Sequence, residues 1–278
     1  MKYIEGVRHA GCRGTTNQLR EYRCYIANVV KDKFHRLSVD GSNYEIALKV
    51  EFSPLSALKN ETIQECIEFA YKMTLGKQGA HRNHRSGGSV LRSEFDIFAD
   101  AFQGKLSEFA FANIVHKKYG VVKPDLSISG LGKWDTVDFE LKELKVAIKS
   151  TKFFGNLLLL ETADWNEDGQ YLPNRDQHSV YDIIVLIRIF PDIHKILKNN
   201  IQNIRPAYQL QDLSKLIIGN KWTYDCPGYI NHDELVYIIR NRFKLPKNST
   251  LNGKTRMDAD NYYIQSGDLN SIDKFLRN

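Results

Sequence analysis

Residues 181–190, YDIIVLIRIF, restrict the fold of this chain most strongly. A short apolar run of this kind, rich in β-branched side chains, predicts a buried strand. Before it, residues 61–73, ETIQECIEFAYKM, carry apolar side chains at helical spacing, and residues 93–118 also read as a helix, with an interruption near Gly104. Helices followed by strands describe an α/β fold with a layered core.

Weaker patterns predict the remaining elements. Residues 43–52 alternate well enough for a strand, and Asn60 is the expected cap of the helix that follows. Residues 156–161, NLLLLE, begin either a strand or a helix, and residues 232–243 predict an amphipathic helix. Residues 1–36, with eight basic residues against three acids, are expected to form a helical arm.

The composition favours a globular protein with an anionic partner. Hydrophobic residues make up 42% and charged residues 26% of the 278 residues, and the net charge is +6. A net positive charge favours a polyanionic partner, although ordinary solvated surface charge explains it equally well. The four cysteines are too scattered for a structural zinc site, and no apolar run is long enough for a signal core or a membrane span. We therefore expect a cytoplasmic protein with no membrane partner.

The stretch WDTVDFELKELKVAIKSTK, residues 134–152, predicts a hairpin with a two-residue turn at Lys142 and Glu143. Because side chains alternate between the faces of a strand, apolar residues point one way and polar residues the other. The polar face carries Asp138 opposite Ala147, with Lys149 within diagonal reach. Glu140 lies on the same face.

Two carboxylates beside a lysine suit metal-assisted hydrolysis of a phosphodiester. Mg²⁺ prefers carboxylate and carbonyl oxygens, and it lowers the pKa of a bound water. A lysine can orient that water and hold a phosphate oxygen as a point charge. The same pattern also describes the solvated face of an ordinary antiparallel hairpin, and the segment by itself leaves both interpretations open.

An acid on one strand, followed on the next by Ile-Lys-Ser, resembles the core of the PD-(D/E)xK nucleases, and most of all their type II restriction endonuclease members. The resemblance covers roughly residues 104–190. It implies that Asp138 is the first metal-binding acid, that Lys149 is the motif lysine, and that the backbone carbonyl of Ile148 faces a metal. Asp125, which follows Pro124, competes for the role of first acid.

The resemblance also implies the architecture. We expect an α/β, restriction-endonuclease-like core with a central mixed sheet flanked by helices and with extra helical segments at both ends. The whole chain, residues 1–278, would be one nuclease domain with its catalytic core at about 93–200. The N-terminal arm, 1–75, and the C-terminal segment, 206–278, would contact DNA or form a dimer.

Ala147 stands where the family normally has its second acid, so either the site is inactive or another carboxylate replaces the missing one. Glu108 is one candidate, because it lies on an apolar helical stripe, where a glutamate is unfavourable unless it is paired or binds a metal. Its alternative role is a salt bridge at a helix edge. Glu161, twelve positions beyond Lys149, is a second candidate, and Glu140 is a third.

Two basic segments without acids suggest a DNA surface. The first, HRNHRSGGSVLR at residues 81–92, continues the glycine-rich loop expected at 76–88, and the second, residues 240–256, contains six basic residues. The expected DNA-binding residues are Arg82, Asn83, Arg85, Arg92 and Lys152.

The implied activity is Mg²⁺-dependent cleavage of double-stranded DNA at a specific short sequence by a homodimer, without a small-molecule cofactor. A non-catalytic DNA-binding protein on a degenerate nuclease fold is the alternative from another class. A repair or junction nuclease of the same superfamily is a third interpretation.

Overall fold

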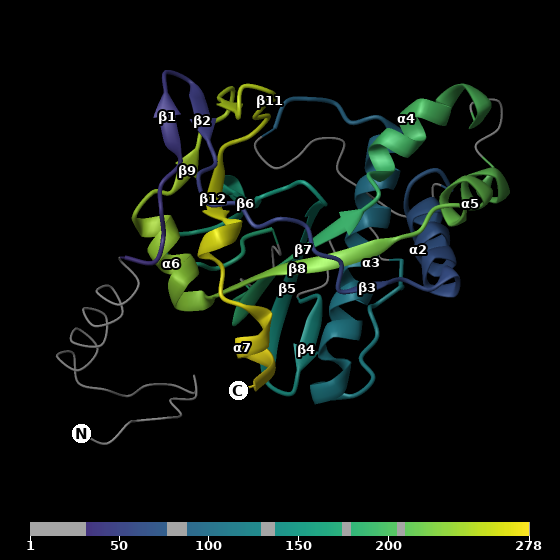
Figure 1. Cartoon of the computed structure of the whole chain (residues 1–278), viewed down its shortest axis with the longest axis horizontal. Helices are drawn as coiled ribbons and strands as arrows, with labels where there is room; N and C mark the ends of the chain where they lie inside the picture. Colours follow the sequence, from purple (N-terminus) through teal and green to yellow (C-terminus); the bar gives the residue numbers. More distant parts are fainter. Residues whose placement is uncertain (1–31, 77–87, 129–136, 174–178, 205–208, 278) are drawn as a thin grey trace. The chain divides into compact units, whose positions relative to one another are not determined.

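The structure is a computed structural model, and it describes residues 32–76, 88–128, 137–173, 179–204 and 209–277 (Figure 1). Residues 35–278 form one compact unit, and the fold below is that of this unit. Most of the predicted N-terminal helical arm, 1–36, lies outside the described residues.

The centre of the unit is a five-stranded mixed sheet in the order β3-β8-β7-β5-β4. Its strands are β3 (Ser56–Ala57), β4 (Phe139–Leu141), β5 (Leu144–Lys152), β7 (Ile183–Phe190) and β8 (Thr223–Asn231). β5 and β7 run parallel, and the other neighbours are antiparallel. The predicted central mixed sheet is confirmed, and it is wider than the range 93–200 because β3 and β8 come from outside that range.

β7 is the strand expected from the apolar run, and seven of its eight residues are buried. Its alternate side chains enter two different environments, as the period of a strand requires. The odd-numbered residues, Ile183 to Ile189, join the main apolar core together with the helices. The even-numbered residue Leu186 lines a cavity on the other face of the sheet.

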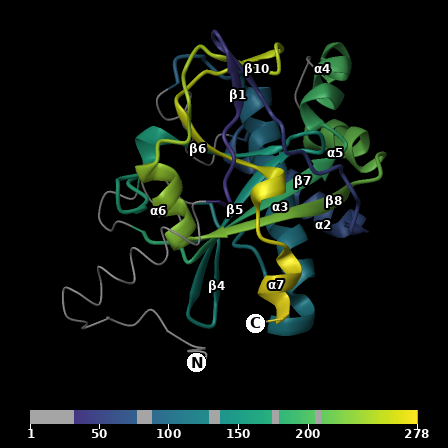
Figure 2. The same cartoon turned by 60° about the vertical axis from the view of Figure 1, so that its left-hand side comes forward.

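Helices cover one face of this sheet. α3 (Glu94–Tyr119) packs on β5 and β7, and α2 (Asn60–Met73) packs on α3. α4 (Ile193–Ile204) and α5 (Leu210–Ile218) extend this layer. Figures 1 and 2 show α2 and α5 beyond α3 on one side of β7 and β8, with α6 (His232–Arg240) on the other side.

Two local expectations about the helices are wrong. α3 continues through Gly104 without interruption, because the apolar side chains on both sides of Gly104, such as Phe102 and Leu106, are fully buried and outweigh the cost of about 1 kcal/mol for one glycine. Asn60 is the first residue of α2 and not its cap. Lys59 takes the cap position, without a side-chain hydrogen bond.

A second, three-stranded sheet faces the carboxyl end of β5. It consists of β6 (Leu157–Glu161), β12 (Asn261–Gln265) and β9 (Lys244–Leu245), all antiparallel. Of the two alternatives left open for residues 156–161, a strand or a helix, the structure has the strand. A third, small sheet has the strand order β1-β2-β10-β11. Its strands are β1 (Ser38–Asp40), β2 (Asn43–Glu45), β10 (Thr250–Leu251) and β11 (Thr255–Arg256).

The predicted strand at 43–52 ends early, at Glu45, for a visible reason. The backbone N–H groups that follow bond to side chains instead of a neighbouring strand. Ile46 donates to Asn252 Oδ1 at 3.1 Å, and Ala47 and Leu48 donate to Gln265 Oε1 at 2.8 and 2.9 Å. Side-chain acceptors of this kind replace a strand ladder.

The C-terminal segment is not the helical addition that was expected. It supplies β8 to the central sheet and β12 to the second sheet, so the described part of this segment, residues 209–277, contributes to the core. The amphipathic helix expected at 232–243 is present as α6, and a short helix, α7 (Ile272–Arg277), follows near the end. None of the helices in the described ranges is both long and apolar enough to cross a membrane.

Candidate active site

The hairpin of β4 and β5 has the register that the sequence predicts. Phe139 pairs with Val146 and Leu141 with Leu144, which leaves Lys142 as the first turn residue and brings Asp138 opposite Ala147. Lys142 has a positive φ of 60°, as tight two-residue hairpin turns require.

Asp138 is fixed at the open end of this hairpin. Its backbone N–H donates to Val146 O at 3.2 Å, and its Oδ2 accepts the backbone N–H of Ile148 at 2.6 Å. Burial raises the pKa of the Asp138 carboxyl, against the opposing effects of the Ile148 N–H and of the Lys149 and Lys105 charges. A cation next to this buried carboxyl group would stabilise its charged form.

The position that corresponds to the second acid of the PD-(D/E)xK pattern is a buried alanine. Ala147 is 2% exposed and lies beside Ile184 of β7. The methyl group of Ala147 offers no ligand to a metal, although Asp138 lies opposite it. A further acidic ligand therefore has to come from another element.

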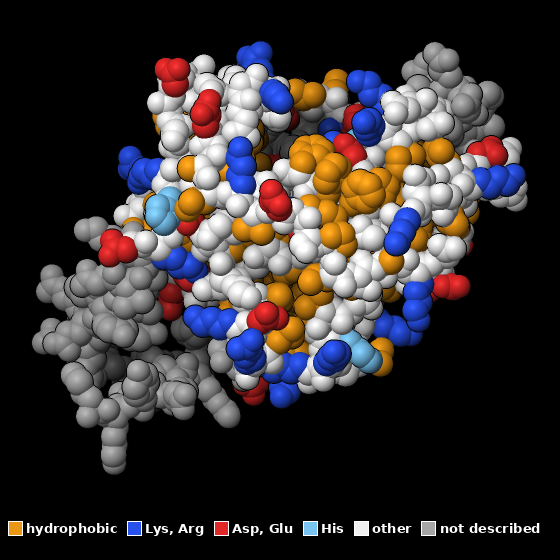
Figure 3. Space-filling model, in the orientation of Figure 1, with side chains coloured by type: hydrophobic (Ala, Val, Ile, Leu, Met, Phe, Trp, Pro, Cys, Tyr) orange, Lys and Arg blue, Asp and Glu red, His pale blue; other side chains and the backbone are white. Residues whose placement is uncertain are grey.

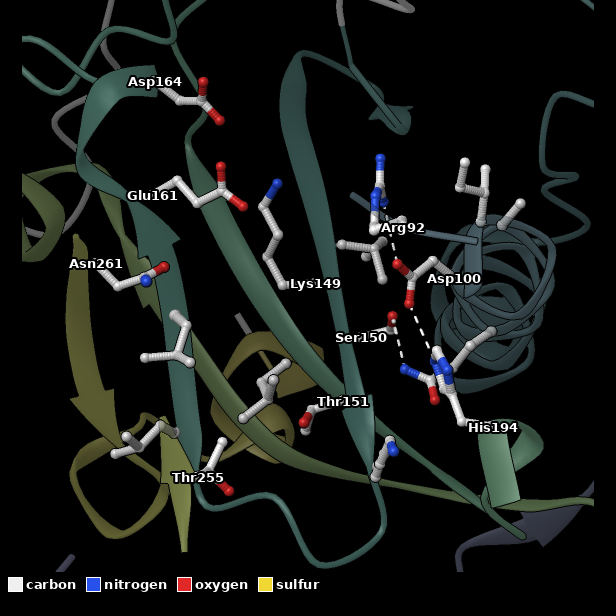
Figure 4. Close-up of a pocket in the computed structure, with 18 of the residues that line it drawn as sticks. Arg92, Asp100, Lys149, Ser150, Thr151, Glu161, Asp164, His194, Thr255 and Asn261 are labelled. Atoms are coloured by element: carbon white, nitrogen blue, oxygen red, sulfur yellow. Dashed lines mark hydrogen bonds and ion pairs between the residues drawn. The ribbon is translucent and has the colours of Figure 1, made fainter. Parts of the chain in front are cut away.

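A cavity of about 720 Å³ follows β5 from Ile148 to Lys152. In Figure 4, Lys149 and Thr151 extend from one side of β5 toward β6, and Ser150 extends from the other side toward α3. The cavity therefore has two ends, one at each side of the strand.

The first end, which we call the lysine end, gathers Lys149, Glu161 and Asp164. Glu161 is the last residue of β6, and Asp164 ends the short 3-10 helix η1 (Thr162–Asp164). The Lys149 ammonium group and the two carboxylates point toward one another in Figure 4. The second sheet thus brings to Lys149 the carboxylates that the hairpin does not provide.

Tyr171 lines this end of the cavity, and two further aromatic rings pack against it. Lys149 Nζ lies 5.7 Å from the centre of the Tyr171 ring, a distance at which the ring face attracts a cation. The ring centres of Tyr171 and Tyr181 are 5.8 Å apart, and Trp165 lies 5.2 Å from Tyr171. Trp165 is buried.

Tyr181 connects the aromatic rings to the acids. Burial, together with the nearby negative charges of Asp138 and Asp164, raises the pKa of its hydroxyl. The hydroxyl therefore stays protonated and can donate a hydrogen bond. Neither Tyr171 nor Tyr181 was expected from the sequence, because no local pattern connects residues 171 and 181 with the hairpin.

Glu108 and Asp125 lie outside the cavity lining. Glu108 Oε2 accepts from Lys105 Nζ at 2.8 Å, which is the salt-bridge role that the sequence left open. Asp125 accepts the backbone N–H and the hydroxyl of Ser127, both at 2.8 Å, and these bonds lower the pKa of Asp125. Asp138 is the one of the two competing acids that bonds to β5. Glu140 is exposed and also lies outside the lining.

The opposite end of the cavity, at α3, contains a hydrogen-bonded polar group. Asp100 accepts from Arg92 at 3.1 Å and lies 3.1 Å from His194 Nε2, and Gln103 donates to the Ser150 hydroxyl at 3.3 Å. Of these residues the sequence suggested only Arg92. The remaining signal was weak, because Asp100 and Gln103 lie within a helix that reads as apolar.

The residues expected to bind DNA are partly described. Arg92 and Lys152 line the cavity, and each is paired with a carboxylate, Lys152 with Asp192 at 3.0 Å. Arg82, Asn83 and Arg85 lie outside the described residues.

The donor atoms at the lysine end fit Mg²⁺. In the described part of the chain no group of three or more His, Cys, Asp or Glu residues is arranged to hold a metal ion. Mg²⁺ keeps several waters, however, and commonly takes only one or two carboxylates from a protein. Glu161 and Asp164 supply carboxylates to the cavity. Asp138 is not part of the cavity lining, but it is bonded to the Ile148 N–H of β5, the strand that carries Lys149.

A comparison of the chain with protein-family models, with curated proteins and with solved structures finds no match.

Proposed function

We propose that this protein is a Mg²⁺-dependent nuclease that hydrolyses phosphodiester bonds in double-stranded DNA. One arrangement carries the proposal: Lys149 of the hairpin, Glu161 at the end of β6 and Asp164 of η1 extend into one cavity, and Asp138 is bonded to the strand that carries Lys149. An ammonium group next to convergent acids suits a phosphodiester that a cation accompanies.

Each residue has a distinct part in this proposal. One or two of the carboxylates of Asp138, Glu161 and Asp164, with the carbonyl of Ile148, would hold Mg²⁺, and waters would complete its coordination. Bound there, the ion would supply an activated water and neutralise phosphate charge.

Lys149 would hold a phosphate oxygen and orient the attacking water. The Tyr171 ring beside its ammonium group limits the positions that this flexible side chain can take. Tyr181, whose hydroxyl stays protonated, would donate a hydrogen bond toward the acids.

The finer features of the proposal rest on the resemblance to type II restriction endonucleases. They are cleavage at a specific short sequence, a restriction-endonuclease-like core, 5′-phosphate products, a homodimer whose two-fold symmetry matches a palindromic target, and a cytoplasmic location. Arg92 and Lys152 would contact the DNA backbone.

The test is to incubate mixed-sequence plasmid DNA with the protein in Mg²⁺ and, in parallel, in EDTA. Discrete fragments that form only with Mg²⁺ support a site-specific enzyme, and a smear supports a general nuclease. DNA that stays intact while the protein binds it overturns the enzymatic proposal. That outcome would favour the non-catalytic DNA-binding alternative, which the buried Ala147 in place of a second acid also suggests.

A further inference from the structure

Four phenylalanines gather where the parallel strands β5 and β7 end. Phe153 and Phe154 follow β5, Phe190 ends β7, and Phe52 comes from the segment before β3. The ring of Phe153 lies 5.0 to 5.9 Å, centre to centre, from the other three rings. We call these four residues the phenylalanine cluster.

The phenylalanine cluster is open to solvent. Phe154 is 60% and Phe190 is 41% exposed, and hydrophobic side chains are visible together near the middle of the face drawn in Figure 3. Exposed apolar groups that lie together mark an interaction site more often than single exposed side chains do.

The cluster is continuous with the candidate active site. Phe154 lines the same cavity as Lys149. At about 3.3 Å per residue, Lys149 and Lys152 are about 10 Å apart along β5. Lys152 Nζ lies 6.0 Å from the Phe154 ring centre and is paired with Asp192. The cavity therefore connects Lys149 with a cation, Lys152, that lies next to an exposed ring.

The size of the exposed surface decides whether a second copy of the protein or a nucleobase covers the phenylalanine cluster. A phenylalanine buries about 200 Å² at most, so Phe154 and Phe190 together offer about 200 Å². A stable contact between two copies of a protein needs about 800 Å² from each partner. Two ring faces are too small for that contact by themselves, but they match the flat face of a nucleobase, which stacks on aromatic side chains.

From these observations we infer that Phe154, supported by Phe190, stacks a nucleobase that has left the duplex, while the phosphate chain of the same strand follows β5 to Lys149. A base inside a duplex is covered on both faces, so only an unpaired or flipped base can present a face to Phe154. The cavity, at about 720 Å³, is within the range of pockets that hold whole small molecules. The inference rests on the proposed function and deepens it: the substrate is DNA with an unstacked base close to the cleaved bond.

The test measures binding in EDTA, where no cleavage is expected, by the fluorescence anisotropy of three labelled DNAs. These are a fully paired duplex, the same duplex with one unpaired adenine, and a single strand. The variants are Phe154→Ala, Phe154→Leu and Phe154→Trp. Val121→Ala is the control, because Val121 is 74% exposed and lies beyond the far end of α3, about 25 Å from Gln103.

We expect the wild-type protein to prefer the duplex with the unpaired adenine. Phe154→Ala and Phe154→Leu should bind that DNA about 5- to 100-fold more weakly, whereas Phe154→Trp and Val121→Ala should bind it as the wild type does. Affinity for the paired duplex should change little in all four variants.

Two results would overturn the inference. One is equal affinity of Phe154→Ala and wild type for the unpaired adenine. The other is full recovery by Phe154→Leu together with a shift from dimer to monomer in Phe154→Ala by sedimentation, which would assign the phenylalanine cluster to contact between copies. In both cases Mg²⁺-dependent cleavage by the wild type would leave the proposed function intact, whereas a wild type that neither binds nor cuts any DNA would remove both.

Discussion

The side chains of Lys149 and Glu161 point toward each other across one cavity although they belong to strands of two different sheets. β5 presents Lys149 in the central sheet, and β6 ends at Glu161 in the second sheet. The site therefore depends on how the two sheets pack, and not on the hairpin alone.

Lys149→Ala should abolish Mg²⁺-dependent plasmid cleavage, because the ammonium group that would hold the phosphate is lost. The free energy of unfolding should change by less than about 1 kcal/mol, since Lys149 is only partly buried. Lys145→Ala is the matched control: it removes an exposed lysine from the same strand and should leave cleavage unchanged. Full activity of Lys149→Ala would show that the hairpin is not the site.

Glu161→Gln should lose DNA cleavage, whereas Glu108→Gln should lose stability. Glu161→Gln should lose cleavage, because a carboxylate leaves the lysine end of the cavity. Glu108→Gln should keep cleavage but lower the free energy of unfolding by about 1 to 3 kcal/mol, since the ammonium group of Lys105 is buried and loses its carboxylate partner. Plasmid cleavage and urea unfolding of both variants check this. The reverse result would assign the second acid to Glu108.

Mg²⁺ should raise the melting temperature of the wild-type protein, because an ion that binds only the folded state stabilises that state. At a hundred times its dissociation constant, the ion adds about 2.7 kcal/mol to the free energy of unfolding. A thermal melt with increasing MgCl₂ measures the shift, with KCl at matched ionic strength as the control. The shift should disappear in Glu161→Gln, and a shift of equal size in that variant would argue against a site at the lysine end.

Asp138→Asn should stabilise the protein at neutral pH and inactivate it. Burial raises the folded-state pKa of Asp138 above its ordinary value of 3.8, so the folded state holds its proton more tightly than the unfolded state. The stability of the wild type is therefore complete below the ordinary value and falls as the pH rises through the folded-state pKa.

An asparagine at position 138 does not ionise, so the variant does not lose stability as the pH rises. Its side-chain oxygen can still accept the N–H of Ile148. Urea unfolding between pH 4 and pH 8 should show little difference between variant and wild type at the acid end and a more stable variant at the neutral end. A variant that is less stable than the wild type at neutral pH would contradict the raised pKa.

Asp225→Ala should destabilise the protein by about 3 to 5 kcal/mol, because it leaves the fully buried guanidinium group of Arg188 without a carboxylate. Arg188 also donates to Val50 O at 2.7 Å and to Glu51 O at 3.0 Å, so the loss should loosen the segment that carries Phe52. Asp168→Ala is the control, since its pair with Arg240 is largely exposed and contributes about 0 to 1 kcal/mol. Equal effects in urea unfolding would contradict the importance of burial.

The sequence by itself determined the local features of this protein. The alternation of residues 137–149 set the faces of the hairpin and brought Asp138 opposite Ala147, and the apolar run of β7 predicted a buried strand. These features depend on the two-residue period of a strand and on a short turn, which are properties of neighbouring residues.

The tertiary structure decided which distant residues meet. On local grounds Glu108 was the first candidate to replace the missing acid and Glu161 the second, but α3 directs Glu108 to Lys105, and β6 directs Glu161 to Lys149. Tertiary packing also decided that β8 enters the central sheet and that Tyr171 lies next to Lys149. They depend on packing between elements far apart in the chain, and the period of a single helix or strand contains no information about which elements will be its neighbours.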